Sequence, residues 1–373
     1  MLATVGIDNG MLKKRKHSMT NTANFRSDNV ATVSPEILHA LEAVNRGPAA
    51  SYGDDDYSRI LNRTFSELFE TAVTVFPVAT GTAANALGLA SCARPYGGIF
   101  CHEQAHIHTA EGGATEAFTG GAKLIPLPGE QFRLTPDSLR RAVSLTQRGI
   151  RNKPQPDAVS VTQASEYGTV YRLEEIAALG DIARSAEIKF HMDGARFANA
   201  LARLGCTPAD MTWRCGIDIL SFGATKNGAM NTEAIVVFDA SLVDPLSYRL
   251  RRAGQTWSKM RFAAAQLIAY VKDGLYLRLA TRANALAGRL ADALTVLPGV
   301  TLVAPVEANL LFVSMPPAMI EALLAAGIGV GRRSETVIRL VTRFDGQEED
   351  IDRLIEIAQR AALPSADFHP HDL

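Results

Sequence analysis

The chain has 373 residues, of which 47% are hydrophobic and 21% are charged, and its formal net charge at pH 7 is −1. This composition is typical of a folded globular protein, and the near-zero charge gives no bulk attraction to nucleic acid or to an anionic membrane. No apolar run approaches the roughly 20 residues that a helix needs to cross a bilayer, and the length predicts two domains or three.

The four cysteines, Cys92, Cys101, Cys206 and Cys215, lie far apart and form no Cys-x-x-Cys pair. This spacing favours buried thiols in a reducing environment over a disulfide framework or a clustered metal site. We therefore expect a cytoplasmic protein.

The N-terminal residues differ from the rest of the chain. The basic run Lys13-Lys14-Arg15-Lys16 has no apolar segment behind it, so it is not a secretory signal. We expect residues 1–23 to form a disordered extension. The sequence leaves open a natural start at Met19 and a short nuclear or organellar address.

The patterned part of the chain begins with helical signals. Ser34 and Pro35 are typical of a helix start, and this helix is predicted to end near Asn45. The polar loop from Ser51 to Tyr57 follows, and a second helix is predicted from Ser58 to Glu70. Loops of this polarity often carry function.

Between residues 73 and 300, short apolar runs alternate with segments that have apolar residues at helical spacing. The runs are too short for helices and are bounded by turn residues, so they predict buried strands. The predicted strands are Val73 to Val78, Gly98 to Cys101, Lys123 to Leu127, Ala158 to Thr162, Ile188 to Met192, Ile217 to Phe222 and Ala234 to Phe238. The predicted helices among them include Thr82 to Ala93, Thr135 to Leu145, Leu173 to Ala183 and Arg196 to Leu204. This alternation predicts a doubly wound, mostly parallel α/β sheet, whose ligands bind at the carboxyl ends of its strands.

The pattern becomes helical after Phe238, above all from Phe262 to Leu294. Beyond residue 299 it predicts a smaller mixed α/β unit. Its predicted strands lie near Leu302, Leu310 to Val313, Ile328 and Ile338 to Thr342, and its helices near Met319 to Ala326 and Glu348 to Ala361. We therefore expect a large domain with its N-terminal segment over residues 24–260, and a helical connection with a small C-terminal domain over residues 261–373.

Three predicted strand ends carry residues that suit one chemistry. The first is Ala79-Thr80-Gly81-Thr82-Ala83-Ala84-Asn85, between a strand and a helix. Its small residues free the N–H groups of a helix N-terminus, and the Thr82 hydroxyl adds a donor, which together suit a phosphate. A helix cap at Thr80 or Thr82 explains this stretch equally well.

The second strand end is His191-Met192-Asp193-Gly194-Ala195-Arg196. A buried aspartate without a partner is costly, so Asp193 pairs either with Arg196 or with a cation on a ligand, such as a pyridinium nitrogen.

The third strand end carries Lys226 between small residues, in Ser221-Phe222-Gly223-Ala224-Thr225-Lys226-Asn227-Gly228-Ala229. A lysine in so crowded a place suggests a salt bridge or a Schiff-base amine, although a surface lysine explains this stretch alone. A phosphate cradle, an aspartate and a lysine, in this order on a doubly wound sheet, are what a pyridoxal 5′-phosphate (PLP) site needs.

With these motifs the chain resembles the low-specificity L-threonine aldolases, from about Phe25 to Ala361. These enzymes belong to the aspartate-aminotransferase, or type I, fold of PLP enzymes. The resemblance implies a three-layer large domain with a mostly parallel seven-stranded sheet, and a smaller α/β C-terminal domain. It also implies a homodimer or homotetramer with sites at a subunit interface, for which the loop from Tyr52 to Tyr57 is the candidate bridging segment.

The resemblance also implies roles for individual residues. Those that contact the cofactor are Gly81, Thr82 and Asn85 in the phosphate loop, His106 stacked on the ring, Asp193 at the pyridine nitrogen, Arg196 at the neighbouring ring oxygen or the substrate carboxylate, and Lys226 at the aldehyde. Those that bind the substrate carboxylate are Ser27, in Arg26-Ser27-Asp28-Asn29-Val30, with Arg196 and Arg339. The implied catalytic residues are Lys226, His106 and Asp193.

The implied reaction is retro-aldol cleavage of L-threonine, L-allo-threonine or a related β-hydroxy-α-amino acid, such as phenylserine, to glycine and an aldehyde. His106 is a candidate for handling the β-hydroxyl proton. A second histidine that many members place between Arg151 and Val159 is missing here. The group that handles this proton therefore stays open.

Two alternatives remain. The same cofactor site serves β-elimination and transamination, because a fold does not determine its reaction. In addition, His102-Glu103-Gln104-Ala105-His106 has the H-E-x-x-H form of zinc hydrolases. That motif works when both histidines face the same way from one helix, and here it follows a predicted strand directly.

Overall fold

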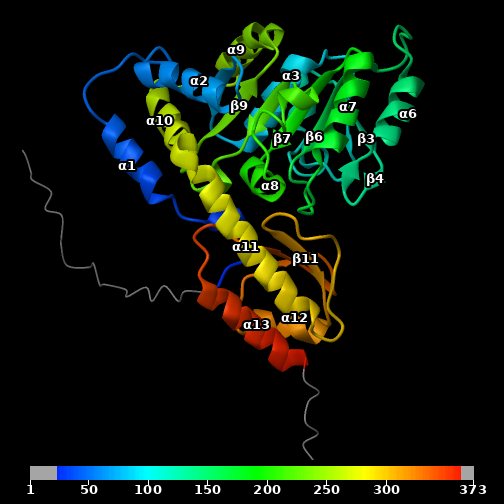
Figure 1. Ribbon diagram of the computed structural model, residues 1–373. Helices are drawn as coiled ribbons and strands as arrows, with labels where there is room; N and C mark the ends of the chain where they lie inside the picture. Colours follow the sequence, from blue (N-terminus) through cyan, green and yellow to red (C-terminus); the bar gives the residue numbers. More distant parts are fainter. Residues whose placement is uncertain (1–22, 363–373) are drawn as a thin grey trace, which may run out of the picture.

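A sheet of seven strands forms the centre of the larger part of the chain in the computed structural model, which describes residues 23–362 (Figure 1). The strands lie in the order β1-β9-β8-β7-β6-β2-β3. Their bounds are β1 Thr74–Val78, β2 Gly97–His102, β3 Lys123–Leu127, β6 Gln155–Thr162, β7 Lys189–Gly194, β8 Ile219–Phe222 and β9 Glu233–Val237. Five adjacent strands, β8, β7, β6, β2 and β3, are parallel to one another. The strand β9 is antiparallel to both of its neighbours, β8 and β1. The predicted mostly parallel seven-stranded sheet is confirmed.

Helices cover both faces of this sheet. On one face, α3 and α9 bury apolar side chains against β1, β8 and β9, as Leu87 and Leu246 do against Ile235. The other face packs against α2, α7, α8 and α10 through a larger core that contains Phe65, Phe222 and Tyr270. The helices of the larger part are α1 Pro35–Val44, α2 Asp56–Leu68, α3 Gly81–Cys92, α4 His106–Thr109, α5 Ala114–Thr119, α6 Pro136–Thr146, α7 Leu173–Ser185, α8 Phe197–Leu204, α9 Val243–Arg252 and α10 Met260–Val271.

The long helix α11, Leu275–Thr295, runs from the larger part to the smaller one (Figure 1). There it packs on a four-stranded antiparallel sheet with the order β10-β11-β13-β12. The elements of the smaller part are β10 Thr301–Leu302, β11 Leu310–Ser314, α12 Pro317–Ala325, β12 Gly331–Arg332, β13 Val337–Val341 and α13 Glu348–Ala362. A two-stranded ribbon, β4 Gly129–Glu130 with β5 Arg133–Leu134, forms a separate small sheet.

The strand predicted near Ile328 is displaced toward the C-terminus. The strand in this region, β12, begins three residues later, and Gly329 forms an isolated bridge with Asn24 instead. The N-terminal segment thus reaches the smaller part, where Ala23 and Phe25 are buried in its core. Residues 1–22 of the predicted N-terminal extension, with the basic run near Lys13 and the start at Met19, and residues 363–373 lie outside the described residues.

Close contact between two strand ends explains the small residues of the lysine stretch. A Cβ atom at Gly223, just after β8, would lie 2.5 Å from the carbonyl oxygen of Ala195, just after β7. A Cβ atom at Gly194 would lie 2.7 Å from the carbonyl oxygen of Ser221. Only glycine therefore allows the ends of β7 and β8 to lie so close, with Asp193 and Lys226 on adjacent strand ends.

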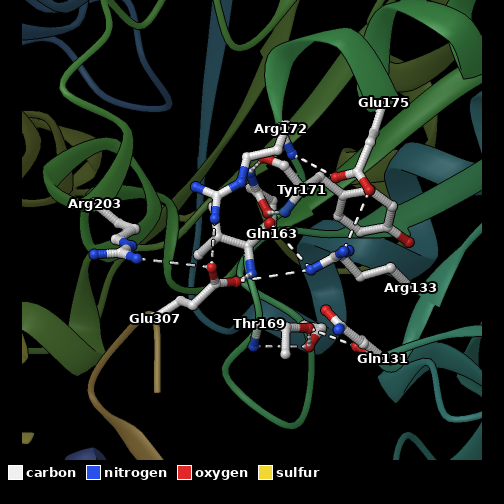
Figure 2. A network of polar contacts seen from close by, with 11 residues as sticks. Gln131, Arg133, Gln163, Thr169, Tyr171, Arg172, Glu175, Arg203 and Glu307 are labelled. Carbon is white, nitrogen blue, oxygen red and sulfur yellow. Dashed lines mark hydrogen bonds and ion pairs between the residues drawn. The ribbon is translucent and has the colours of Figure 1, made fainter. Parts of the chain in front are cut away.

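A buried carboxylate joins the smaller part to the larger one. Glu307, which precedes β11, accepts hydrogen bonds from the Val170 N–H at 2.8 Å and from Arg172 Nη2 at 2.6 Å. The guanidinium groups of Arg133 and Arg203 lie 3.7 and 3.9 Å from its oxygens (Figure 2). The loop between β6 and α7 is thereby attached to the smaller part of the chain.

Glu307→Ala is expected to lower the free energy of unfolding by about 3 kcal/mol. This is the lower end of the range for breaking a buried ion pair, because Arg133, which is largely buried, would keep its ion pair with Glu175, and Arg172 and Arg203 reach solvent. The matched control is Glu321→Ala, which removes an exposed pair with Arg332 and should cost at most about 1 kcal/mol. Equal losses in urea unfolding of the two variants would show that Glu307 does not hold the two parts together.

No helix within residues 23–362 is both long enough and apolar enough to cross a membrane.

Candidate active site

A cavity of about 300 Å³ opens at the carboxyl ends of the parallel strands. Its volume is at the small end of the range for cofactor and ligand sites. The predicted site residues that line it are Gly81, Thr82, Asn85, His106, Asp193, Arg196 and Lys226. The three predicted strand ends therefore meet at one place, as expected for a doubly wound sheet.

The N-terminus of α3 forms one wall of this cavity. Thr80 is the N-cap, and its hydroxyl accepts the Ala83 N–H at 3.1 Å. The N–H groups of Gly81 and Thr82 have no hydrogen-bond partner among residues 23–362. A Cβ atom at Gly81 would meet nothing within 4 Å, so there is open space at this helix end. Free N–H groups at a helix N-terminus form a site for an anion.

Asp193 lies at the base of the cavity and is only 3% exposed. Its Oδ1 accepts the Ala195 N–H at 2.9 Å, and its Oδ2 accepts Asn85 Nδ2 at 2.9 Å. The predicted alternative, a pair between Asp193 and Arg196, is wrong. Arg196 binds Asp28 instead, through Nε at 2.8 Å and Nη2 at 3.0 Å. Asp193 is thus a buried carboxylate without a cationic partner among the described residues, an arrangement that favours a cation on a ligand.

A chain of hydrogen bonds runs from Asp193 to His106. Asn85 Nδ2 also donates to Glu111 Oε1 at 2.8 Å, and the same oxygen lies 2.9 Å from His106 Nδ1. The hydrogen bond to Glu111 raises the pKa of His106, although burial acts in the opposite direction. Glu111 therefore fixes the orientation of the imidazole and favours its protonated form.

Lys226 lies in the turn after β8, within the 3₁₀-helix Thr225–Asn227. Its Nζ atom has no hydrogen bond or ion pair with another described residue. The buried carboxylate of Glu233 holds the turn by accepting the N–H groups of Ala224 at 2.5 Å and Thr225 at 3.3 Å. Burial raises the pKa of Glu233, while the positive charge of Lys226 acts in the opposite direction. The lysine is thus held at the cavity with a free amine.

Ser27 and Arg339 are not in the cavity wall. The Ser27 hydroxyl accepts the Asn29 N–H at 3.2 Å, and Asn29 lines the cavity. Arg339 Nη2 donates to the Arg26 carbonyl oxygen at 2.8 Å, while its buried Nε has no partner among the described residues. Burial, together with the charges of Arg333 and Arg196, lowers the pKa of Arg339 to about 10. The two predicted carboxylate binders therefore lie near each other, beside the cavity.

Four acidic residues of the site were not assigned a role from the sequence: Asp28, Glu111, Glu166 and Glu233. Glu111 follows His106 by five residues, which is a weak local signal. The others have no such signal, because Asp28 reaches Arg196 across the fold, Glu233 begins a buried strand, and Glu166 lies in a loop.

The H-E-x-x-H stretch does not have the geometry of a zinc helix. His102 ends β2, and its Nδ1 accepts the Gln104 N–H at 3.1 Å. His106 begins α4 and faces Glu111. The two histidines therefore do not project from the same helical turn, as the zinc motif requires. Within residues 23–362, no group of three or more His, Cys, Asp and Glu side chains is arranged to hold a metal ion.

The side chains around the cavity fit PLP. The free N–H groups of Gly81 and Thr82 suit its phosphate, the unpaired carboxylate of Asp193 suits a protonated ring nitrogen, and the free amine of Lys226 suits its aldehyde. The buried atoms Asn85 Oδ1 and Glu111 Oε2 also have no partner among the described residues, so polar groups remain available in the cavity wall.

A buried histidine lies beneath Asp193 on β7. His191 is fully buried, and its Nδ1 and Nε2 lie 2.9 Å from Ser160 Oγ and 3.0 Å from Ser221 Oγ. It links three adjacent strands, β6, β7 and β8. Burial lowers the pKa of His191 to about 4, so the ring stays neutral in the folded protein.

His191→Gln is expected to reduce the acid sensitivity of the fold. Below pH 6.5 the unfolded chain binds a proton at His191 that the folded chain does not, so this histidine lowers stability as pH falls from 6.5 to about 4. A pKa lowered this far corresponds to about 3 kcal/mol. The free energy of unfolding of both proteins is measured in urea across this pH range. As pH falls from 6.5 to about 4, the wild type should lose about 3 kcal/mol more than the variant. A difference that stays constant with pH would contradict a neutral buried His191.

Comparisons with known proteins agree with this site. The family model for beta-eliminating lyases matches residues 24–316. A protein of Pseudomonas aeruginosa named low specificity L-threonine aldolase is 41% identical over 349 residues, which cover 92% of this chain and 98% of that protein. A second, from a Pseudomonas species, is 44% identical over 303 residues, or 81% of this chain and 87% of that protein. The solved structure of Leishmania major threonine aldolase superposes with a TM-score of 0.85 at 26% identity and covers 91% of this chain and all of that one.

The family model and both Pseudomonas proteins span most of the chain, and the fold is shared with a solved threonine aldolase. The chain therefore belongs to the beta-eliminating lyase family, as the resemblance of its motifs predicted.

Proposed function

We propose that the protein is a PLP-dependent aldehyde-lyase that cleaves L-threonine, L-allo-threonine or a related β-hydroxy-α-amino acid to glycine and an aldehyde. The main observation behind the proposal is that the α3 N-terminus, Asp193 and Lys226 all line one cavity. The names of the two Pseudomonas proteins, which are more than 40% identical to this chain, support the substrate class.

Each residue of the cavity has a proposed task. Lys226 would bind the cofactor aldehyde, the N–H groups of Gly81 and Thr82 would hold its phosphate, and Asp193 would hold a proton on its ring nitrogen. The bound cofactor supplies the electron sink for cleavage of the Cα–Cβ bond. His106, oriented by Glu111, would lie against the ring.

The substrate carboxylate is proposed to bind beside the cavity. Arg339 has an unpaired Nε and lies next to the segment of Ser27, so both can reach one carboxylate. Arg196 is held by Asp28. Burial would raise the pKa of Asp28, but the adjacent guanidinium of Arg196 keeps this pKa below its usual value. Arg196 therefore contributes a charge whose position is fixed.

Product analysis tests the proposed reaction. The purified protein with PLP is incubated with L-threonine, L-allo-threonine or phenylserine, without a keto acid, and glycine and aldehyde are measured. Equal amounts of glycine and aldehyde support the proposal. Release of ammonia with a keto acid would assign β-elimination, and a requirement for a keto-acid acceptor would assign transamination.

We also propose that the enzyme is cytoplasmic and works as a homodimer or homotetramer. The segment from Tyr52 to Tyr57 supports the second point, because Tyr52 is 51% exposed and its ring packs only 4.7 Å from the guanidinium of Arg251. An exposed aromatic side chain that packs on an arginine suits a contact with a second copy of the chain. Light scattering of the eluted protein measures the oligomeric state, and a monomer at assay concentration would contradict it.

A further inference from the structure

One more ionisable side chain, Glu166, reaches the cavity from the loop that follows β6. Its Oε1 accepts the His106 N–H at 2.6 Å and the Thr162 hydroxyl at 2.9 Å. Thr162 ends β6, directly beside Asp193 on β7. The carboxyl group is thus held between the end of β6 and the start of α4. It lies at the carboxyl-terminal ends of the strands, as Asp193 does.

The loop that carries Glu166 is fixed at several points. The Gln163 side chain closes it by accepting the Tyr171 N–H and donating to the Tyr171 carbonyl, both at 3.0 Å (Figure 2). The Thr169 hydroxyl donates to the Gln131 carbonyl at 2.8 Å, and Glu307 binds the loop from the smaller part. A side chain held in this way keeps one position relative to a ligand, as a catalytic group requires.

The hydrogen bonds from His106 N and Thr162 both go to Oε1 of Glu166, so the second carboxyl oxygen, Oε2, accepts neither of them, and the side chain lines the cavity. Burial and the charge of Asp193 raise the pKa of Glu166 to about 7. The other ionisable groups around it are His106 on α4, Cys101 on β2 and Tyr171 in its own loop. The group can therefore both take up and release a proton near neutral pH, as general acid–base catalysis needs.

His106 is less suited to accept a proton. Its Nδ1 is bound to Glu111, and its raised pKa favours the imidazolium, which has no free lone pair. Glu166 lines the cavity, and its second carboxyl oxygen, Oε2, takes no part in the hydrogen bonds from His106 N and Thr162. His106 is therefore assigned to the contact with the cofactor ring, and Glu166 to the exchange of the proton.

We propose, on the basis of the aldol cleavage proposed above, that Glu166 is the catalytic residue that exchanges a proton with the substrate β-hydroxyl group. In the cleavage direction the hydroxyl proton passes to Glu166 Oε2, and the O–H electron pair forms the second bond of the aldehyde carbonyl. The Cα–Cβ bond breaks, and its electron pair stays with the Cα fragment. Protonation of Cα then completes glycine, so that one proton has moved from oxygen to carbon.

Glu166→Gln tests this role, because glutamine keeps the shape and an oxygen that accepts from His106 N and Thr162 but takes up no proton. We expect kcat for cleavage to fall by about 10²- to 10⁴-fold, and the ionisation near pH 7 to disappear from the profile of kcat/KM. Exchange of the glycine α-proton in D2O involves no β-hydroxyl group, so it should stay within a few-fold of wild type. Equal losses in cleavage and exchange would assign a purely structural role and overturn the inference.

A second readout needs neither cofactor nor turnover. In the folded protein Glu166 holds its proton to higher pH than in the unfolded chain, so its contribution to stability is lost as pH rises from 4.5 to about 7. The apoprotein should therefore lose stability relative to E166Q over this range in urea unfolding. A constant difference between the two proteins would overturn the inference.

The matched control is Glu103→Gln, an exposed carboxylate just before α4, which should cleave at the wild-type rate. The outcomes separate the two proposals. If the wild type cleaves L-threonine and E166Q cleaves it equally fast, Glu166 is not the proton carrier and the proposed function stands. If the wild type releases no glycine from any β-hydroxy-α-amino acid, the proposed function itself is wrong.

Discussion

Lys226→Ala is expected to lower kcat for cleavage of L-threonine by at least about a thousandfold, the scale on which removal of a bond-forming or proton-transferring group acts. Lys226 is the amine that the turn after β8 presents to the cavity, and its Nζ atom has no competing partner among the described residues. The turn itself is held by Glu233 and by Asn227, whose side chain donates to Tyr270 and to the Tyr276 carbonyl. The variant should therefore fold normally and lose only the amine.

Two further variants make this result specific. Lys226→Arg keeps the positive charge but not the primary amine, so it should be as inactive as the alanine variant. Lys189→Ala removes a lysine that pairs with Asp239 at the amino-terminal end of β7, away from the cavity. This variant should retain the wild-type kcat. A Lys226→Ala enzyme with near-wild-type turnover would contradict covalent attachment at this position.

Asp193→Asn is expected to lower kcat by about 10²- to 10³-fold, the effect of losing one preorganised electrostatic contact in an active site. The asparagine keeps an oxygen for the Ala195 N–H but has no charge to hold a proton on the ring nitrogen. Cleavage of L-threonine and exchange of the glycine α-proton both depend on the electron sink, so both should fall together. This joint loss separates Asp193 from Glu166, whose substitution should affect cleavage alone.

Asp218→Asn is the matched control for this variant. Asp218 is an aspartate near the other end of the same strands, where it accepts the Phe190 N–H at 2.8 Å. Its substitution should change stability but leave kcat within a few-fold of wild type. If both aspartate variants kept wild-type α-proton exchange, Asp193 would have no part in the chemistry.

The strand positions were predictable because apolar runs bounded by turn residues mark buried strands. Lys123–Leu127 was predicted at its observed bounds. The strand predicted to begin at Ala158 begins at Gln155 instead, because Asp157 is a buried strand residue paired with Arg94. A contact of this kind lies between distant residues and leaves no periodic pattern in the sequence.

The three strand ends of the site were likewise predictable, because a doubly wound sheet brings the carboxyl ends of its strands together. The partners of these residues were not. A pair between Arg196 and Asp193 was one of two alternatives that the sequence left open, but the fold brings Asp28 to Arg196 from a segment 168 residues away. Glu166 lies in a loop with no periodic signal, and only its hydrogen bonds to His106 N and Thr162 identify it.

The most direct test of the site is chemical trapping of its cofactor. The purified protein is loaded with PLP, reduced with borohydride and digested, and the modified peptide is sequenced by mass spectrometry. The predicted result is one phosphopyridoxyl group per chain, attached to Lys226 in the turn after β8. Attachment to a different lysine, or tight PLP binding without any modified lysine, would contradict the site described here.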